Sequence, residues 1–321
     1  MRDSCGRTGQ GRPHRRISAE EAPRTARGKR STWSTNQQAN FNTAKKQKRC
    51  NAMKKSVVSK EYQNLQKDIL TLQENWKKSI NPESIIPNLN KAAMSAGVPA
   101  AALASINFEI SLFVQWIEEI NALLIKNNPE LESKLADILT LLNEETAIRW
   151  IDEAFSFNSV YFAGFAEENE LEEWIPQFLA ETALRPYLQL TADKIQHEIT
   201  HAVPGAGCPV CGEPARLAVL EAEGKKVMTC PRCLARWNAK RIECAHCGND
   251  DHETIQFLTI EGDASSQIQV CEKCTGYIKV IDTRQYLSKP SAAMLDLTTI
   301  HLDFVAQDQG YHAIGQEKLT N

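Results

Sequence analysis

The feature that most constrains this chain is a set of four Cys-x-x-Cys pairs between residues 208 and 274. These pairs hold eight of the ten cysteines in 321 residues, a content too low for a disulfide-dense miniprotein. A Cys-x-x-Cys turn presents two thiolates to one edge of a metal ion, and two such turns complete a tetrahedral four-sulfur site. The other two cysteines, Cys5 and Cys50, are isolated. We therefore expect metal-stapled modules rather than a disulfide scaffold.

Two metal sites follow if each pair binds together with its neighbour along the chain. Strand-like stretches lie between the partners, at residues 216–220 and 225–229 and again at 254–260 and 267–270. This pattern is typical of two tandem zinc-ribbon or rubredoxin-like units, and interleaved pairing is the alternative. The predicted ligands are Cys208, Cys211, Cys230 and Cys233 for the first site, and Cys244, Cys247, Cys271 and Cys274 for the second. Because zinc and iron both accept four thiolates, the predicted cofactor is two metal ions per chain, iron or zinc.

The residues around the second pair have two interpretations. A basic cluster with an aromatic residue, Trp237, could contact nucleic acid. We favour the simpler interpretation, in which the basic residues offset thiolate charge and Trp237 belongs to the local core. The basic residues are Arg232, Arg236, Lys240 and Arg241. Since each site already has four cysteines, no histidine ligand is expected at His246 or His252, and His197 and His201 are expected on the surface.

The segment before the cysteines has the periodicity of an all-α domain of five to seven helices. Apolar residues recur every three or four positions over residues 58–80, and glycine occurs only twice in residues 53–200. A second helix is expected to run from Pro99 to about residue 126, since proline is tolerated in a first turn. Pro176 and Pro186 are expected to break or bend later helices.

The net charge of −3 hides two unlike parts. Residues 1–52 carry 13 Lys/Arg and 3 Asp/Glu, whereas residues 53–321 carry 24 and 37. The basic segment lacks apolar periodicity, so we expect it to be disordered, and we interpret it as a translation artefact upstream of Met53 or a dispensable tail. Arg15-Arg16 is followed by acidic residues rather than by the apolar region of an export signal, so no export is expected.

The acidic remainder of the chain favours a protein partner over nucleic acid, because phosphate binding needs a positive surface. The sequence contains no run of 18 apolar residues, so no membrane span is predicted. Chemistry-bearing motifs such as a Ser-His-Asp set, a glycine-rich phosphate loop or His-Glu-x-x-His are not recognised, so we predict no catalytic or cofactor-binding residue and no enzyme activity.

A helix is expected after Pro290. Its predicted apolar stripe is Ala293, Leu297, Ile300 and Phe304, and a polar face holds Asp296, Thr299 and Asp303. The polar face is either solvated or in contact with the ribbons or a partner. Together these patterns predict an α+β multidomain chain. The expected parts are a tail at 1–52, a helical domain at 53–203, ribbons at 204–241 and 242–286, and a C-terminal helix and tail at 287–321.

Several segments carry a distinctive combination of cysteines and neighbours. They are Cys-Pro-Val-Cys-Gly-Glu-Pro from residue 208, Cys-x-x-Cys-x-x-x-Trp at 230–237, Cys-x-x-Cys-x-x-Tyr-Ile-Lys at 271–279, and Asp296-Leu297, Leu302-Asp303 and Gly310-Tyr311 downstream. In these segments the chain resembles the formate dehydrogenase accessory protein FdhE family. The resemblance covers residues 208–315 and is only generic in the helical half.

This resemblance implies an all-α domain joined to two rubredoxin-like metal modules in a cytoplasmic, non-catalytic maturation factor. Such proteins are needed for the activity of molybdenum- or tungsten-dependent formate dehydrogenases. The implied partner is the catalytic subunit, held as the client of a chaperone. The residues themselves leave two other classes open: a ribbon-based nucleic-acid-binding protein, and a thiol or iron redox protein.

Overall fold

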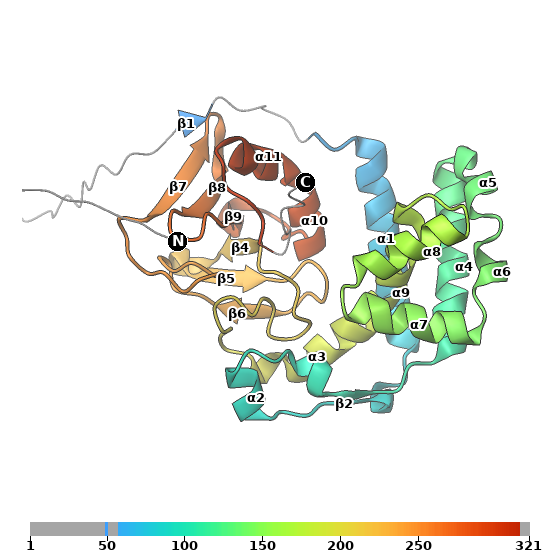
Figure 1. Cartoon of the computed structure of the whole chain (residues 1–321). Coiled ribbons are helices and arrows are strands. Elements are labelled where there is room, and N and C mark those ends of the chain that lie inside the picture. The colour runs from blue at the N-terminus through green and yellow to red at the C-terminus, as the bar shows by residue number, and fades with distance from the viewer. Residues whose placement is uncertain (1–48, 51–56, 315–321) are drawn as a thin grey trace, which may run out of the picture. The chain divides into compact units, whose positions relative to one another are not determined.

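The structure is a computed structural model that describes residues 49–50 and 57–314 (Figure 1). Apart from Arg49–Cys50, the basic segment predicted to be disordered at residues 1–52 lies outside the described residues. Arg49–Cys50 forms strand β1, which pairs in parallel with β7 (Ile255–Ile260). Each helix within residues 57–314 is too short or too polar to cross a bilayer.

The first half of the described chain is helical, as the periodicity predicts. Its helices are α1 (Lys60–Ser79), α2 (Lys91–Ser95), α3 (Ala100–Leu103), α4 (Ile110–Asn127), α5 (Glu132–Leu135), α6 (Ile138–Leu141), α7 (Glu144–Phe155), α8 (Ser159–Glu168) and α9 (Trp174–Ile195). Asparagine and serine side chains cap several of them; Ser59 of α1, for example, accepts a hydrogen bond from the Tyr62 amide.

Helix α9 is the centre of this half and packs against α1, α4, α7 and α8 (Figure 1). Aromatic side chains fill the junction. Trp76 of α1 stacks on Trp116 of α4 with ring centroids 5.3 Å apart, and Trp116 lies 5.7 Å from the ring of Tyr187 in α9. All three rings are buried, so the helices share one apolar core.

The helix predicted from Pro99 to about residue 126 is split in two. Pro99 caps only the short α3, and α4 begins at Ile110. Between them, Ser105–Ile106 (β3) pairs antiparallel with Ile85–Ile86 (β2). Because Ile85 is buried, this small ladder fixes the connection between α1 and α4, and it overrides the local helical preference.

Of the two effects expected from its prolines, a break or a bend, helix α9 does not show a break. Pro176 lies in the first turn, where a missing amide hydrogen is tolerated. Pro186 lies inside the continuous helix, and its absent N–H leaves the Thr182 carbonyl without its helical donor. The buried Gln73 side chain of α1 donates to that carbonyl instead, at 3.0 Å, so the helix passes through Pro186 uninterrupted.

The cysteine region forms one sheet with strand order β1-β7-β8-β9-β4-β5-β6. Its other strands are β4 (Leu217–Leu220), β5 (Lys226–Thr229), β6 (Arg236–Asn238), β8 (Asp263–Cys271) and β9 (Tyr277–Asp282). The first ribbon supplies β4, β5 and β6, and the second supplies β7, β8 and β9. They join where β4 runs parallel to β9, with Leu217 opposite Lys279. The predicted fold class is confirmed, and the shared sheet adds a junction that the strand pattern does not predict.

The predicted C-terminal helix is two helices, α10 (Ala292–Thr298) and α11 (Ile300–Asp308). Their buried face is not the stripe predicted from the sequence: Phe304 is 48% exposed, whereas the buried positions are Ala292, Met294, Leu295, Thr299, Leu302 and Ala306. Small alanines in this face let the two helices approach the sheet closely, and α11 contacts both β8 and β9 (Figure 1).

Candidate metal centres

The first cluster gathers the four cysteines that the tandem pairing predicts. The Sγ atoms of Cys208 and Cys233 lie 3.5 Å apart, and those of Cys211 and Cys230 lie 3.6 Å apart. All four sulfur atoms lie within 4.8 Å of one another. A tetrahedral site with metal–sulfur bonds of ~2.3 Å has sulfur–sulfur edges of roughly 3.8 Å, so the donor set fits one metal ion.

The second cluster has the same geometry. The Sγ–Sγ distances are 3.5 Å between Cys244 and Cys274 and 3.7 Å between Cys247 and Cys271, and all four sulfur atoms again lie within 4.8 Å. The eight cysteines are free thiols rather than disulfides. The structure thus groups the cysteines in tandem and not in the interleaved order, while their role as metal ligands stays a prediction.

Each of the four Cys-x-x-Cys pairs is followed directly by a residue with a left-handed backbone. The values of φ are +77° at Gly212, +64° at Leu234, +72° at Gly248 and +55° at Thr275. After the first three pairs, the amide of this residue donates to the carbonyl of the first cysteine, over 2.9 to 3.0 Å. The sequence marks this position with glycine after only the first and third pairs. Leu234 and Thr275 adopt it at a steric cost, since side chains disfavour this region.

The electrostatics of the clusters favour a cation between the sulfurs. Burial raises the pKa of Cys208 and of Cys233 well above the usual thiol value. Burial also acts to raise the pKa of Cys271, but hydrogen bonds from the Cys274 amide and the Asn249 side chain outweigh it and lower the pKa to about 7. Four thiolates in this space also repel one another without a metal, so a divalent ion between them would offset both this repulsion and the cost of burying their charge.

Asn249 supports the second cluster in a way that spacing alone does not reveal. Its Nδ2 donates to the Cys271 sulfur at 3.5 Å and to Thr254 Oγ1 at 2.8 Å, and its carbonyl accepts from the Cys244 amide. A donor to a ligand sulfur orients that sulfur and stabilises its charge. The signal that could identify Asn249 is its position two residues after a pair, where an amide side chain can turn back.

Arg232 lies between Cys230 and Cys233 and joins the first cluster to the helices. Its Nε and Nη2 donate to the two carboxylate oxygens of Glu181 in α9 at 2.9 and 3.0 Å, and Nη2 also donates to the Ala154 carbonyl. The guanidinium lies 4.0 Å from the centre of the Phe157 ring. Burial lowers the pKa of Arg232, but the charge of Glu181 outweighs it and the net shift is upward.

Two more residues of the basic cluster pair with acidic partners. Arg236 pairs with Glu221 at 2.7 Å, and Lys240 pairs with Glu243 at 2.8 Å. Trp237 is 5% exposed and belongs to the same apolar core as Cys230 and Cys233, so its predicted place in the core is confirmed. Arg232 is buried, so its guanidinium is not accessible to a phosphate group.

The histidines considered from the sequence lie outside both clusters. His246 Nε2 lies 3.1 Å from the Tyr277 carbonyl, where it fixes the third pair against β9. His197 is largely exposed beside Glu198, and His252 lies 3.9 Å from Asp251. Within the described part of the chain, the potential metal-binding groups contain cysteines alone.

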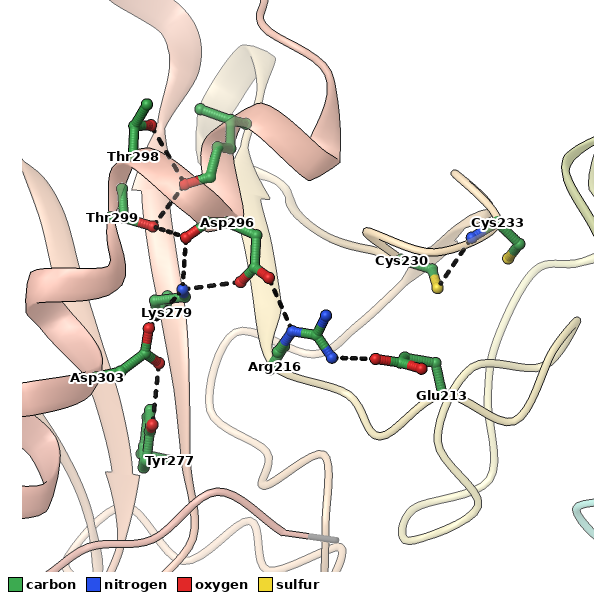
Figure 2. A network of polar contacts seen from close by, with 11 residues as sticks. Glu213, Arg216, Cys230, Cys233, Tyr277, Lys279, Asp296, Thr298, Thr299 and Asp303 are labelled. Atoms are coloured by element: carbon green, nitrogen blue, oxygen red, sulfur yellow. Dashed lines mark hydrogen bonds and ion pairs between the residues drawn. The ribbon is translucent and has the colours of Figure 1, made fainter. Parts of the chain in front are cut away.

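A chain of charged side chains connects the first ribbon, the second ribbon and the C-terminal helices, with Lys279 buried and the others partly buried (Figure 2). Arg216, just before β4, pairs with Glu213 and with Asp296 of α10, the latter at 2.9 Å. Lys279 of β9 pairs with Asp296 at 2.8 Å and with Asp303 of α11 at 2.7 Å. These contacts confirm that the polar face of the C-terminal segment meets the ribbons.

Tyr277 completes this network by donating its hydroxyl to Asp303 at 2.9 Å (Figure 2). Thr299 does not cross to the ribbons; its hydroxyl donates to the Leu295 carbonyl within the helical segment. Lys279 is 1% exposed, so its ammonium depends on both carboxylates for its charge balance. The network therefore orients α10 and α11 relative to the β4–β9 junction.

Comparison with known proteins identifies related chains. Residues 242–320 match the family model described as FdhE, C-terminal domain. A curated relative from Aquifex aeolicus, named Protein FdhE homolog, is 26% identical over 226 residues, which cover 69% of this chain and 74% of the relative. A second Protein FdhE homolog, from Stutzerimonas stutzeri, is 31% identical over 113 residues but spans only 35% of that protein.

A solved structure shares the fold. The crystal structure of the FdhE protein from Pseudomonas aeruginosa superposes with a TM-score of 0.53 over 78% of this chain and 85% of that chain. At 19% sequence identity this likeness speaks for the fold alone. The family model and the curated relatives carry the relationship in sequence, and in sequence this chain is similar to FdhE proteins.

Proposed function

We propose that this protein is a non-catalytic maturation factor that binds the catalytic subunit of a molybdenum- or tungsten-dependent formate dehydrogenase until its cofactors are loaded. The relationship to FdhE proteins supports a formate dehydrogenase accessory protein family. The observation that carries the proposal is the pair of four-sulfur clusters joined through one sheet. Such an arrangement stiffens a binding platform.

The clusters hold one metal ion each in this proposal, iron or zinc. The ligands are the eight cysteines of the two groups, Cys208, Cys211, Cys230 and Cys233, and Cys244, Cys247, Cys271 and Cys274. When bound, the metals staple the turns of the ribbons and, if iron, supply a centre that senses redox state. The protein itself supplies the donor set, the amide donors to sulfur and the ion pairs that hold the ribbons to their neighbours.

The client is a protein and not a nucleic acid. Residues 53–200 carry 12 Lys/Arg and 22 Asp/Glu, so the helical half attracts a basic protein surface and repels phosphate. The ion pairs of Arg232 with Glu181 and Arg236 with Glu221 further reduce the positive surface beside the first cluster. We place the encounter in the cytoplasm, where the client is made.

Affinity isolation of the full chain from cells that produce formate dehydrogenase tests this proposal. We expect the catalytic subunit to co-purify, and metal analysis of the same sample to give two ions per chain. Removal of the gene should abolish formate dehydrogenase activity while the catalytic polypeptide is still made. Full activity without the gene, or isolation of nucleic acid in place of the subunit, would contradict the proposal.

A further inference from the structure

The two clusters differ in how far solvent can reach their sulfur atoms. All four cysteines of the first cluster are buried, with Cys211 the most exposed at 6%. In the second cluster Cys244 and Cys271 are buried, whereas Cys274 is half-buried and Cys247 is exposed. The geometry of the sulfur atoms is the same in both clusters, so burial is what distinguishes them.

The helical half closes the first cluster. The amides of Ala100 and Ala101 in α3 donate to the carbonyls of Pro209 and Val210, both over 2.9 Å, and so hold the first Cys-x-x-Cys turn from outside the ribbon. A Cβ added to Gly212 would lie 3.0 Å from Pro99 and 3.8 Å from the Phe157 ring. Each of these contacts must open before a large ligand can reach Cys211.

Arg232 closes the other turn of the first cluster. It lies within the second Cys-x-x-Cys pair, and its ion pair with Glu181 and its hydrogen bond to the Ala154 carbonyl bind that turn to α9 and α7. Both turns of the first cluster are therefore held by the helices. Access to the metal there requires separation of the ribbon from the helical half.

The second cluster is braced on one side only. The Gly205 amide donates to the Ala245 carbonyl at 2.9 Å, and His246 contacts the Tyr277 carbonyl, so the middle of the third pair is fixed. Cys271 is held by Asn249. Cys247 is exposed beyond these contacts. Lys273, within the fourth pair, lies 4.0 Å from Asp251, and these two side chains are 56% and 39% exposed.

We infer that the second cluster is the readily exchangeable metal site of this protein and that ligand exchange begins at Cys247, while the first cluster releases its metal much more slowly. In the exchange, the bond between the metal and Cys247 Sγ breaks, and a bond to an incoming sulfur or chelating donor forms. The released thiolate takes a proton from water, and no electron is transferred. The inference rests on the proposal that both clusters hold metal.

The consequence is a division of labour between the two sites. The buried site keeps the ribbon fixed to the helices whatever the metal supply. The exposed site is filled or emptied according to the metal and thiol content of its surroundings, or by a donor group of a bound client protein. The metal content of the second cluster can therefore change while the rest of the fold stays intact, and so it can act as a signal.

Metal release from the full-length, zinc-loaded protein tests the inference. The protein is treated with excess EDTA, and native mass spectrometry follows the number of bound zinc ions over time. Each sample is also treated briefly with N-ethylmaleimide, and the labelled cysteines are identified by peptide mapping. We expect a species with one zinc to accumulate, because exposure speeds attack on a ligand sulfur, with the two release rates differing on the order of tenfold or more. Among the eight cysteines of the two clusters, Cys247 should be labelled earliest.

Labelling of the one-zinc species decides between the two sites. Label on Cys244, Cys247, Cys271 and Cys274 with protection of the first cluster supports the inference. Label on the first cluster, or simultaneous loss of both ions, overturns it. A chain that never binds zinc or iron would instead refute the proposed metal sites themselves, so the two failures are distinguishable.

Substitutions at equivalent positions give a matched comparison. Cys247→Ser should lower the bound zinc from two ions to one and leave the labelling pattern of the first cluster unchanged. Cys211→Ser, at the same position of the other site, should expose the remaining cysteines of the first cluster and loosen the α3 contact. Equal effects of the two substitutions on the first cluster would overturn the inference, and the wild-type release experiment needs neither variant to fold.

Discussion

At the scale of the residue, the molecule repeatedly satisfies a buried polar group with a partner that is distant in sequence. The Thr182 carbonyl, left without a helical donor by Pro186, accepts from Gln73, which is 109 positions away. Arg232 is satisfied by Glu181 and by the Ala154 carbonyl. Each arrangement follows from the high cost of an unpaired polar group in an apolar interior.

The contact of Gln73 with Thr182 gives a prediction about stability. Gln73→Leu should lower the free energy of unfolding by ~1–3 kcal/mol, because the Thr182 carbonyl then lies buried without a donor. Urea denaturation followed by circular dichroism measures the change. A Pro186→Ala background restores the helical N–H to that carbonyl, so the same Gln73→Leu change should cost less there. Equal costs in the two backgrounds would contradict this account.

Asp296 gives a prediction about pH. Burial acts to raise its pKa, but the positive charges of Arg216 and Lys279 outweigh it and hold the pKa below the usual carboxyl value. A carboxyl with a lowered pKa stabilises the fold above its unfolded pKa of ~3.9 and loses that contribution as the pH falls through the folded value. Asp296→Asn should therefore cost about 3 kcal/mol at pH 7, because Lys279 keeps one carboxylate instead of two.

The measurement compares urea unfolding of the wild type and Asp296→Asn between pH 7 and pH 3. The gap between their unfolding free energies should narrow below about pH 4, where the carboxyl of the unfolded wild type binds a proton while that of the folded protein stays ionised to lower pH. Metal bound at the proposed sites would leave both proteins over the same acidic range, so the difference isolates Asp296. Asp282→Asn is a matched control, because Asp282 pairs with the exposed Arg284 and should cost little. A gap that stays constant to pH 3 would rule out the role of Asp296.

At the scale of the element, the sequence predicts helices, strands and cysteine groups that have a local repeat. It does not predict elements whose burial or pairing depends on a distant segment of the chain. The helix over residues 58–80, four of the ribbon strands and both cysteine groups follow from spacing. Strand β9 does not, because Lys279 interrupts its apolar character and its burial depends on Asp296 and Asp303. The parallel pairing of β4 with β9 is likewise invisible in either strand alone.

The C-terminal helices show why a periodic stripe can be read on the wrong face. Two sets of residues recur at helical spacing, and the prediction chose the one with the larger side chains, including Phe304. The structure buries the other set, which includes Ala292 and Ala306. Thr299 fits within it because its hydroxyl is satisfied by the Leu295 carbonyl. Periodicity specifies that one face is buried, whereas the shape of the sheet beneath decides which.

At the scale of the whole molecule, the two metal clusters are parts of one sheet but have different neighbours. The first is held by α3, α7 and α9, and the second by the linker around Gly205 and by its own strands. The grouping of the eight cysteines into two sets of four could be predicted from the sequence because their spacing is local. The difference in burial could not, since it arises from contacts of Pro99, Phe157 and Arg232 that join segments far apart in the chain.

This difference predicts how the molecule responds when metal is removed. Complete removal should loosen the ribbons and release the α3 amides of Ala100 and Ala101, whose acceptors lie in the first Cys-x-x-Cys turn. The apolar core around Trp116 and Tyr187 continues into the first cluster, but these two rings pack on each other between α4 and α9, so amides of these helices should stay protected. Hydrogen exchange measured by mass spectrometry on the full chain, before and after chelation, follows each segment separately.

A partial treatment sharpens this test. When only one ion has been removed, exchange should rise in the amides around Cys247 and Asn249, while Ala100 and Ala101 remain protected because their acceptors are still held in place. When the second ion leaves, protection at these two amides should fall together with that of β4 and β5. Loss of α9 protection in the first stage would mean that the helical core depends on the metals for its stability. Retention of that protection would instead mean that the helical half is stable without metal. The metals would then serve to hold the ribbons against it.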